Sequence, residues 1–252
     1  ATHAPDGAAH PAILVEDAVL AMGALAREVV RRVREHSPTT VIGITGSAGK
    51  TTTKDLLAAL LATQGPTVAP VGSYNGEVGV PLTVFRAELD TRFLVVEMGA
   101  DHVGNIAYLC DIVRPDIGVV LMVGTAHAGS FGGVANIART KGELVEALGP
   151  EGVAVLNLDD ERVAGMAART AAPITWFTAD ERGVARAAED VAASRASGLV
   201  AARDVRSDDQ ERPVFDLQVG TDEAAVRHPV ASGLTGLHHV HNVLAAAAAA
   251  HA

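Results

Sequence analysis

A glycine-rich loop between an apolar, β-branched run and a helix-forming run carries the most specific chemistry in the sequence. The run 40–45 leads into the segment 46–52, which reads GSAGKTT. Glycines let main-chain N–H groups approach phosphate oxygens, and the start of a helix attracts anions. A lysine in this position contacts the outer phosphates, and the hydroxyl after it ligates Mg²⁺. We therefore predict a nucleoside triphosphate site formed by Gly46, Ser47, Ala48, Gly49, Lys50, Thr51 and Thr52.

The loop departs at one position from the commonest phosphate-loop pattern, G-x-x-x-x-G-K-[ST]. Ile44 occupies the first glycine position, and only the shorter pattern G-x-x-G-K-[ST] is met, over residues 46–51. The alternative is a chance Gly-Lys-Thr turn. The expected strand before the loop and helix after it favour phosphate binding.

An acidic residue at the end of another apolar run supplies a second part of such a site. The segment Phe93–Glu97 is apolar until Glu97, at the place where P-loop proteins carry a metal-side carboxylate. A simple charge at a strand end is the alternative. Because Mg²⁺ prefers oxygen ligands, we predict that Thr51 and Glu97 hold it.

The elements that must position these residues alternate along the chain. Strands are expected at 40–45, 92–97, 117–123, 153–157 and 174–178, and helices at 16–34, 51–63, 104–112, 134–148, 161–169 and 236–252. Residues 189–230 alternate apolar and polar, which predicts a small antiparallel section. The pattern therefore predicts an α/β fold of the P-loop NTPase type. Its mostly parallel sheet would have helices on both faces and a small antiparallel section.

Composition excludes several classes of protein. The 20 Lys and Arg against 30 Asp and Glu give a net charge of −10, the wrong sign for a nucleic-acid binder. The single Cys110 rules out a disulfide framework, and we expect it to be a small buried side chain. The longest apolar run, 243–250, is too short to span a bilayer, and no secretory signal is visible. A cytoplasmic protein without a membrane span is expected.

Other polar residues and two aromatic ones have ordinary interpretations. Of the three histidines at 238, 239 and 241, helical geometry places only the first and last near one face, so a zinc site is not favoured. Trp176 and Phe177, on an expected strand, are predicted to be core residues. We expect loop or capping roles for Asp101, Asp159 and Asp160.

Several segments, in matching order and spacing, resemble the Mur ligases, the ATP-dependent amide ligases that build the peptide stem of peptidoglycan. The segments are 44–52 (ITGSAGKTT), 75–83 (NGEVGVPLT), 96–100 (VEMGA), 124–127 (GTAH), 141–143 (KGE) and 236–250 (GLHHVHNVLAAAAAA). The resemblance covers about residues 13–252. Within the family, the segments 75–83, 96–100 and 141–143 favour the branch that adds D-alanyl-D-alanine.

This resemblance implies roles for residues whose type alone indicates none. It adds His127 to Thr51 and Glu97 as a Mg²⁺ ligand, although histidine is an unusual ligand for a hard cation. Lys141, by itself a solvated lysine, matches a lysine that CO₂ carbamylates, which turns a cation into an anionic ligand for a second Mg²⁺. The implied catalytic residues are Lys50, Glu97, His127 and Lys141.

Two asparagines also gain roles from the resemblance. Asn75 matches a substrate-side position, with Gly76 where a second asparagine is common. Asn242 matches an asparagine that contacts adenine, with His238 before it at the usual spacing and His239 where another asparagine is usual.

The implied reaction has two steps. ATP phosphorylates the carboxylate of UDP-MurNAc-tripeptide to an acyl phosphate, and the amine of D-Ala-D-Ala then attacks it. The resemblance thus implies ATP, Mg²⁺ and a carbamate on Lys141 as cofactors, small-molecule substrates, no nucleic acid, and a monomer. Residues 1–35 are expected to be a leader and a remnant of the N-terminal domain, and residues 36–252 the central ATP-binding domain. With the C-terminal domain absent, we expect the chain alone to form no amide bond.

Other functions remain open at this point. A P-loop switch or motor ATPase shares the phosphate loop. So do folylpolyglutamate and cyanophycin synthetases, against which the segment 75–83 argues. A GTPase would need Asn-Lys-x-Asp, and the nearest match, 157–160 (NLDD), lacks the lysine. A nucleotide-binding fragment without ligase activity is the last alternative.

Overall fold

One mixed sheet organises the part of the chain that the structure describes, a computed structural model covering residues 13–125, 131–221 and 225–252. Its strand order is β2-β3-β1-β4-β5-β6-β7-β8-β9. The strands are β1 (Thr40–Thr45), β2 (Thr67–Val68), β3 (Phe93–Glu97), β4 (Ile117–Val120), β5 (Val153–Asn157), β6 (Ile174–Thr178), β7 (Gly198–Ser207), β8 (Pro213–Val219) and β9 (Val226–Ala231).

Strands β1 to β7 pair in parallel, whereas β8 and β9 are antiparallel additions beyond β7. The predicted fold class is therefore confirmed. The expected start of the antiparallel section was wrong, because residues 189–192 end a helix, α8 (Glu181–Ala192). The side chain of Asp180 accepts a hydrogen bond from the Arg182 amide and caps that helix, a signal that the sequence prediction missed.

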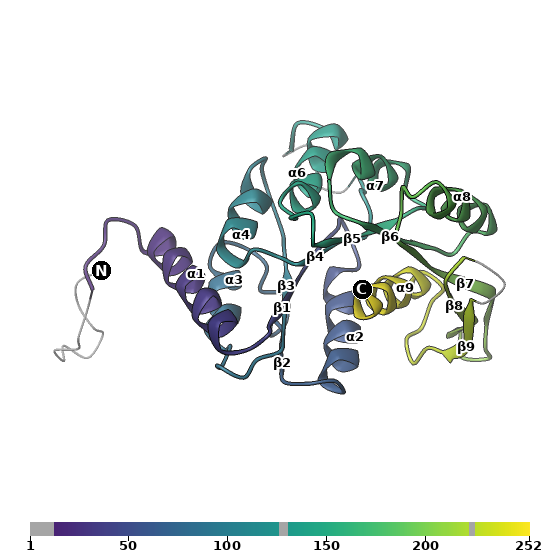
Figure 1. Cartoon of the computed structure of the whole chain (residues 1–252), viewed down its shortest axis with the longest axis horizontal. Coiled ribbons are helices and arrows are strands. Elements are labelled where there is room, and N and C mark those ends of the chain that lie inside the picture. The colour runs from purple at the N-terminus through teal and green to yellow at the C-terminus, as the bar shows by residue number, and fades with distance from the viewer. Residues whose placement is uncertain (1–12, 126–130, 222–224) are drawn as a thin grey trace.

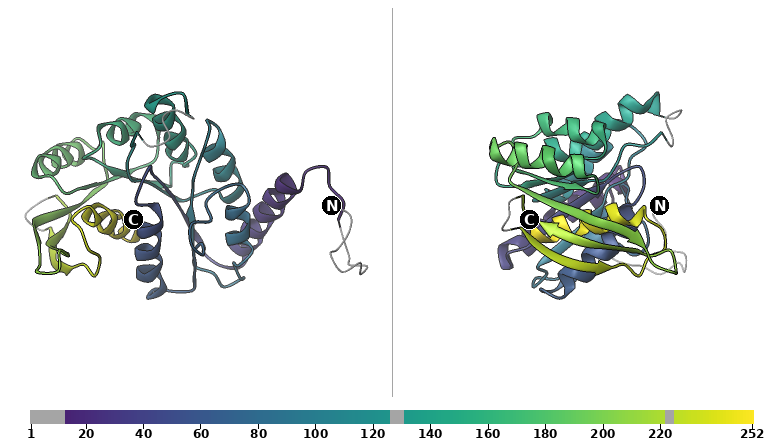
Figure 2. Two further views of the ribbon diagram at one scale, coloured as in Figure 1. Left: turned by 180° about the vertical axis from the view of Figure 1, so that it is seen from behind. Right: turned by 90° about the vertical axis from the view of Figure 1, so that its right-hand side faces the viewer.

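Helices cover both faces of the sheet (Figures 1 and 2). On one face lie α4 (Asn105–Val113), α6 (Val134–Glu146), α7 (Glu161–Ala164, extended by a 3₁₀ turn over Gly165–Arg169) and α8, and on the other lie α2 (Lys50–Ala62) and α9 (His239–His251). Helix α1 (Ala18–His36) packs outside α4 and the short α3 (Gly79–Val84). No helix among the described residues is long and apolar enough to cross a membrane.

Alternation along each strand divides the core into two layers. Leu94 and Val96 on β3 face the α4–α6 side, while Val95 between them faces α2 and α9. On β6, Trp176 and Phe177 enter opposite layers and are both buried, as predicted. Cys110 is buried as expected, and burial raises the pKa of its thiol to about 12.

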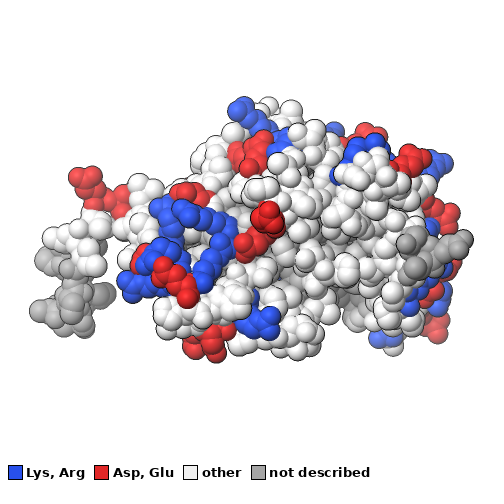
Figure 3. Space-filling model, in the orientation of Figure 1, with Lys and Arg blue, Asp and Glu red and all other residues white. Residues whose placement is uncertain are grey.

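Helix α1 is held by apolar packing and by charged side chains. Ala26 and Val30 enter the core beside α4. Arg34 donates to the carboxylate of Asp116 at 2.6 Å and to the main-chain carbonyl of Arg114 at 2.8 Å. Figure 3 shows the basic side chains around this helix interleaved with acidic ones. The charges at this surface are therefore largely paired with one another.

The sequence predicted neither β2 nor α3, because two and six residues are too short for a periodic signal. They frame residues 69–78, a connection without regular structure that returns to the end of β3. The connection turns tightly before α3: a Cβ on Gly79 would lie 2.7 Å from the carbonyl carbon of Tyr74. A Cβ on Gly76 would meet nothing within 4 Å.

This contrast predicts different costs for two alanine substitutions in one loop. Gly79→Ala should lower the free energy of unfolding by about 1–3 kcal/mol, because main chain rather than a flexible side chain must move. Gly76→Ala should change the free energy of unfolding by less than about 0.5 kcal/mol. Urea denaturation of both variants measures these values, and equal values for the two would contradict the loop geometry.

Candidate active site

The phosphate loop joins β1 to α2. Gly49 has φ +82°, and a Cβ there would also collide with the side-chain oxygen of Asn242. A Cβ on Gly46 would lie 2.9 Å from Cβ of Leu121. Close packing therefore favours glycine at both positions, and at Gly49 the left-handed backbone conformation favours it as well. The ammonium of Lys50 donates to the carbonyl of Gly46 at 2.9 Å, so the lysine folds over its own loop.

Glu97 lies at the end of β3, beside Ile44 of β1. Its side chain is 1% exposed, and its two oxygens accept hydrogen bonds from the Thr51 hydroxyl at 3.0 Å and the Asn75 amide at 2.9 Å. Among the described residues, no cationic group lies within 4 Å of this carboxylate. This buried carboxylate therefore has no counter-charge among those residues, and its neighbours are a hydroxyl and a side-chain amide. Because hard divalent cations prefer oxygen ligands, such a group suits Mg²⁺.

Asn75 reaches Glu97 because its own main chain is fixed at the end of β3. The amide of Gly99 donates to the carbonyl of Asn75 at 2.8 Å. A Cβ on Gly99 would lie 2.6 Å from the side-chain oxygen of Asn75, so the glycine leaves room for this close approach. The segment 75–83, found in the sequence by resemblance, thus meets the strand end at 97–99 through its first residue.

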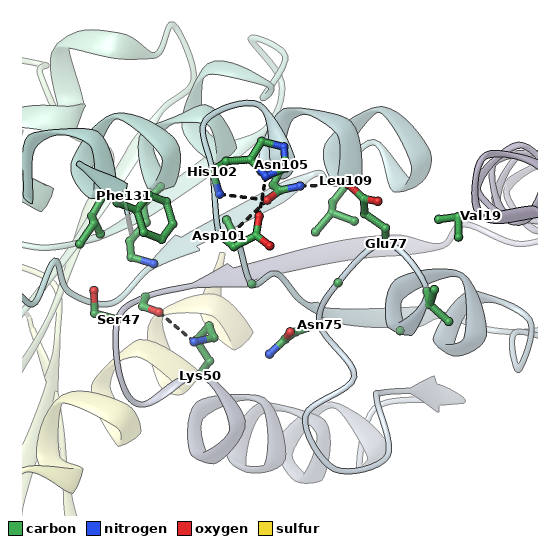
Figure 4. A pocket seen from close by; sticks show the side chains of 18 residues that line it. Val19, Ser47, Lys50, Asn75, Glu77, Asp101, His102, Asn105, Leu109 and Phe131 are labelled. Atoms are coloured by element: carbon green, nitrogen blue, oxygen red, sulfur yellow. Dashed lines mark hydrogen bonds and ion pairs between the residues drawn. The ribbon is translucent and has the colours of Figure 1, made fainter. Parts of the chain in front are cut away.

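A cleft of about 700 Å³ opens beside these residues (Figure 4). Its walls bring together Gly46, Ser47, Lys50, Asn75 and Lys141, which come from the loop, α2, the 69–78 connection and α6. The hydroxyl oxygen of Ser47 is buried and has no hydrogen-bond partner among the described residues. A free donor beside Lys50 in a hollow of this size fits an anionic oxygen ligand such as phosphate.

Lys141 is buried, contrary to the expectation of a solvated lysine from residue type alone. Burial, and then the charge of Lys50, lower the pKa of Lys141 to about 8. No carboxylate among the described residues forms an ion pair with it. A large share of this amine is therefore neutral near pH 8, the form that reacts with electrophiles.

Two polar residues, Glu143 and Asn105, stabilise the segments around the cleft. Sequence reasoning gave neither of them a role. Glu143 of α6 accepts hydrogen bonds from the amides of Gly104 at 2.7 Å and Ala107 at 3.0 Å, and so caps α4. The side chain of Asn105 accepts from the amide of Asp101 at 3.1 Å and donates to Glu77 at 3.0 Å. Neither role was visible in the sequence, because each depends on contacts between separate elements.

The remaining predicted residues have different places. Asn242 does not line the cleft; it packs behind the loop, where its oxygen accepts from the Thr53 hydroxyl at 3.4 Å and its amide meets His239 at 3.0 Å. His127 falls outside the described residues. Asp160 caps α7 as expected. Asp159 lies in the loop before that helix, also as expected, and its carboxylate accepts from the amide of Ala179 at 2.7 Å and lies 2.8 Å from Nε2 of His241.

A mostly parallel sheet with a glycine-rich phosphate loop after β1 and an acid at the end of β3 defines an α/β nucleotide-binding domain of the P-loop class. Comparison with protein families narrows the class. The family model for the Mur ligase middle domain matches residues 44–250. The chain belongs to the Mur ligase family, which confirms the resemblance seen in the sequence.

Named relatives agree with this assignment. The chain is 48% identical over 211 residues to UDP-N-acetylmuramoyl-tripeptide–D-alanyl-D-alanine ligase of Mycobacterium tuberculosis H37Rv, covering 84% of this chain and 38% of the relative. It is 37% identical over 150 residues to the enzyme of that name from Escherichia coli K12, covering 60% and 32%. The chain thus spans well under half the length of the relatives it matches.

Solved structures give the same family. MurF from Acinetobacter baumannii superposes with a TM-score of 0.78 at 31% identity, covering 94% of this chain and 47% of that one. MurF from Thermotoga maritima, solved in complex with ADP, gives a TM-score of 0.73 at 29% identity, covering 93% and 49%. Both alignments include nearly all of this chain.

The low pKa of Lys141 is directly measurable, since the chain has three lysines, at 50, 54 and 141. In an NMR titration of the lysine ε-carbons, the Lys141 signal should titrate near pH 8. Lys50→Met should raise that pKa part of the way back, because the larger cause, burial, remains. A Lys141 midpoint above about pH 10, the value of a free lysine, would disprove this environment.

Proposed function

We propose that this chain forms the nucleotide-binding part of an ATP-dependent ligase that joins D-alanyl-D-alanine to UDP-N-acetylmuramoyl-tripeptide. The names of the mycobacterial and E. coli relatives support this reaction. Because the chain spans 38% of the length of the mycobacterial relative, the activity is proposed for the whole protein. The observation that carries the proposal is the buried Glu97 carboxylate, held by Thr51 and Asn75 beside the phosphate loop.

Different residues around the loop are proposed to bind different parts of the substrates. In this proposal the amides of residues 46–52 and the Lys50 ammonium hold the β- and γ-phosphates of ATP. Lys50 would exchange its contact with the Gly46 carbonyl for a phosphate oxygen. Asn242, packed behind Gly49, is proposed on the adenine side, and Asn75 on the side of the peptide carboxylate.

Glu97, Thr51 and His127 are the proposed holders of Mg²⁺. The buried carboxylate, which has no cationic partner in the part of the chain that the structure describes, and the adjacent hydroxyl fit such an ion. Bound Mg²⁺ would offset the repulsion between a carboxylate and a triphosphate. Asn75 would keep one oxygen of Glu97 occupied by a neutral donor, and so fix the orientation of the other toward Thr51.

Lys141 is proposed to carry the carbamate. A neutral amine attacks CO₂ to form R–NH–COO⁻ and releases one proton. The pKa of Lys141, lowered by burial and by Lys50 to about 8, supports this step. A carbamate beside Lys50 would also replace a repulsive contact between two cations with an attractive one.

The remaining assignments extend the proposal. We propose residues 36–252 as the central ATP-binding domain and residues 1–35 as a leader and a remnant of a preceding domain. We also propose that the protein is a monomer, and that it acts in the cytoplasm, where ATP, the proposed co-substrate, is available.

Two substitutions separate nucleotide binding from metal binding. Lys50→Met should weaken binding of a non-hydrolysable ATP analogue about 100-fold, because a charge-assisted contact to phosphate is lost. Glu97→Gln keeps the hydrogen-bonding shape but removes the charge, so Mg²⁺ should no longer strengthen binding. Isothermal titration with and without Mg²⁺ measures both. Binding that is indifferent to Lys50 and to Mg²⁺ would refute the proposed function.

The carbamate predicts a separate signal. With ¹³C-labelled bicarbonate at pH 8, NMR should show a carbamate resonance that is lost in Lys141→Met and retained in Lys54→Met, which distinguishes it from the carbamate that the α-amino group also forms at this pH. Absence of that resonance in the unsubstituted chain would remove the carbamate from the proposal and leave the ATP site untouched.

A further inference from the structure

Lys54 is a buried lysine that the proposed chemistry does not use. It lies on α2, one helical turn after Lys50, and is 2% exposed. Its ammonium donates to the main-chain carbonyls of Pro70 and Gly72, each at 3.0 Å, and lies 2.6 Å from the carboxylate of Asp55. These three partners match the three N–H donors of an ammonium group. A lysine is seldom buried unless it is paired in this way.

The two carbonyls belong to the 69–78 connection, which ends in the site. No strand or helix pairs the carbonyls of residues 69–75, so those that are shielded from solvent need other donors. Arg86 donates to the carbonyl of Ala69 at 2.7 Å, and the amide of Gly99 to that of Asn75 at 2.8 Å. Between these two contacts, the ammonium of Lys54 donates to the carbonyls of Pro70 and Gly72.

The position of Lys54 on α2 gives these contacts a functional consequence. Thr51 and Lys54 are three residues apart, and therefore lie on one side of the helix. Thr51 contacts one oxygen of Glu97 directly. Asn75 contacts the other oxygen, and its chain is tied to the same helix by Lys54. Helix α2 thus carries one donor to the buried carboxylate and, together with the Gly99 amide at the end of β3, holds the segment that carries the other.

We propose that Lys54 is a positioning residue: by holding the Pro70 and Gly72 carbonyls it fixes Asn75 against Glu97, and thereby tunes the affinity of the site for Mg²⁺-nucleotide. The positioning of Asn75 stands on the hydrogen bonds alone. Its effect on Mg²⁺ rests on the proposed function.

The positioning is tested without any ligand, by hydrogen–deuterium exchange followed by mass spectrometry. In Lys54→Met, peptides covering residues 69–79 should exchange about tenfold faster, because two charge-assisted hydrogen bonds to that segment are lost. Peptides covering α4 should be unchanged. Asp55→Asn is the matched control, since it changes the exposed third partner and keeps both carbonyl contacts. Lys54→Arg, which retains a cationic donor, should restore part of the protection.

The functional effect is tested by titrating a non-hydrolysable ATP analogue with and without Mg²⁺ into the 252-residue chain. Lys54→Met should reduce the Mg²⁺-dependent gain in affinity about tenfold and leave metal-free affinity unchanged. In an Asn75→Ala background, Lys54→Met should have little further effect, since both act on one contact. A purely structural lysine would lower thermal stability without this coupling.

The outcomes are distinguishable. Unchanged exchange at 69–79 in a folded Lys54→Met variant overturns the positioning role. Faster exchange with full Mg²⁺ dependence, or additive effects of Lys54→Met and Asn75→Ala, overturns the link to the metal. If the unsubstituted chain itself shows no Mg²⁺-dependent binding, the proposed function fails, and with it the link to the metal, while the exchange experiment still decides the positioning role.

Discussion

The carboxylate of Glu97 is 1% exposed and accepts hydrogen bonds from two neutral donors, Thr51 and Asn75. Within the described residues it has no cationic partner. Removing a charge from water is costly, and neutral hydrogen bonds compensate only part of that cost. The donors must therefore be held closely. Parallel pairing of β1 and β3 sets Glu97 beside Ile44, just before the phosphate loop. Helix α2 brings Thr51, and the 69–78 connection brings Asn75. Three separate elements thus converge on this one buried charge.

The lysines that line the cleft have the opposite electrostatic problem, which is repulsion between like charges. Lys50 and Lys141 come from different helices and line one hollow, and the charge of Lys50 contributes to the low pKa of Lys141. Two positive charges that face each other are unfavourable without an anion between or beside them. Within the described part of the chain, Lys50 and Lys141 line the cleft without an acidic partner, and Glu97, which has no cationic partner there, adjoins the cleft through Asn75. Anionic oxygens and a divalent cation together would relieve both.

The sequence predicted mainly those features that depend on residues close together along the chain, and missed several features that depend on contacts between distant segments. The sequence placed Lys50, Thr51 and Glu97 near one another, because the carboxyl ends of parallel strands meet at one edge, and in the structure Thr51 and Glu97 are in contact. The burial of Lys141 was missed from residue type, since a lysine on a helix is usually solvated. Helix α3 and strand β2 were too short to show a period. Helix α8 was missed although its Asp180 cap lay in the sequence.

Two residues that sequence reasoning missed, Glu143 and Lys54, share one physical feature: their side chains bind main-chain groups of another segment. Glu143 binds the amides that open α4, and Lys54 binds carbonyls before Asn75. Loops at the carboxyl edge of a parallel sheet leave main-chain groups without ladder partners, and buried groups of this kind must be satisfied. A site built on such loops therefore needs charged side chains that hold the loops in position rather than bind the ligand. Substitution of these side chains should alter how well the site is aligned before it alters which groups the site contains.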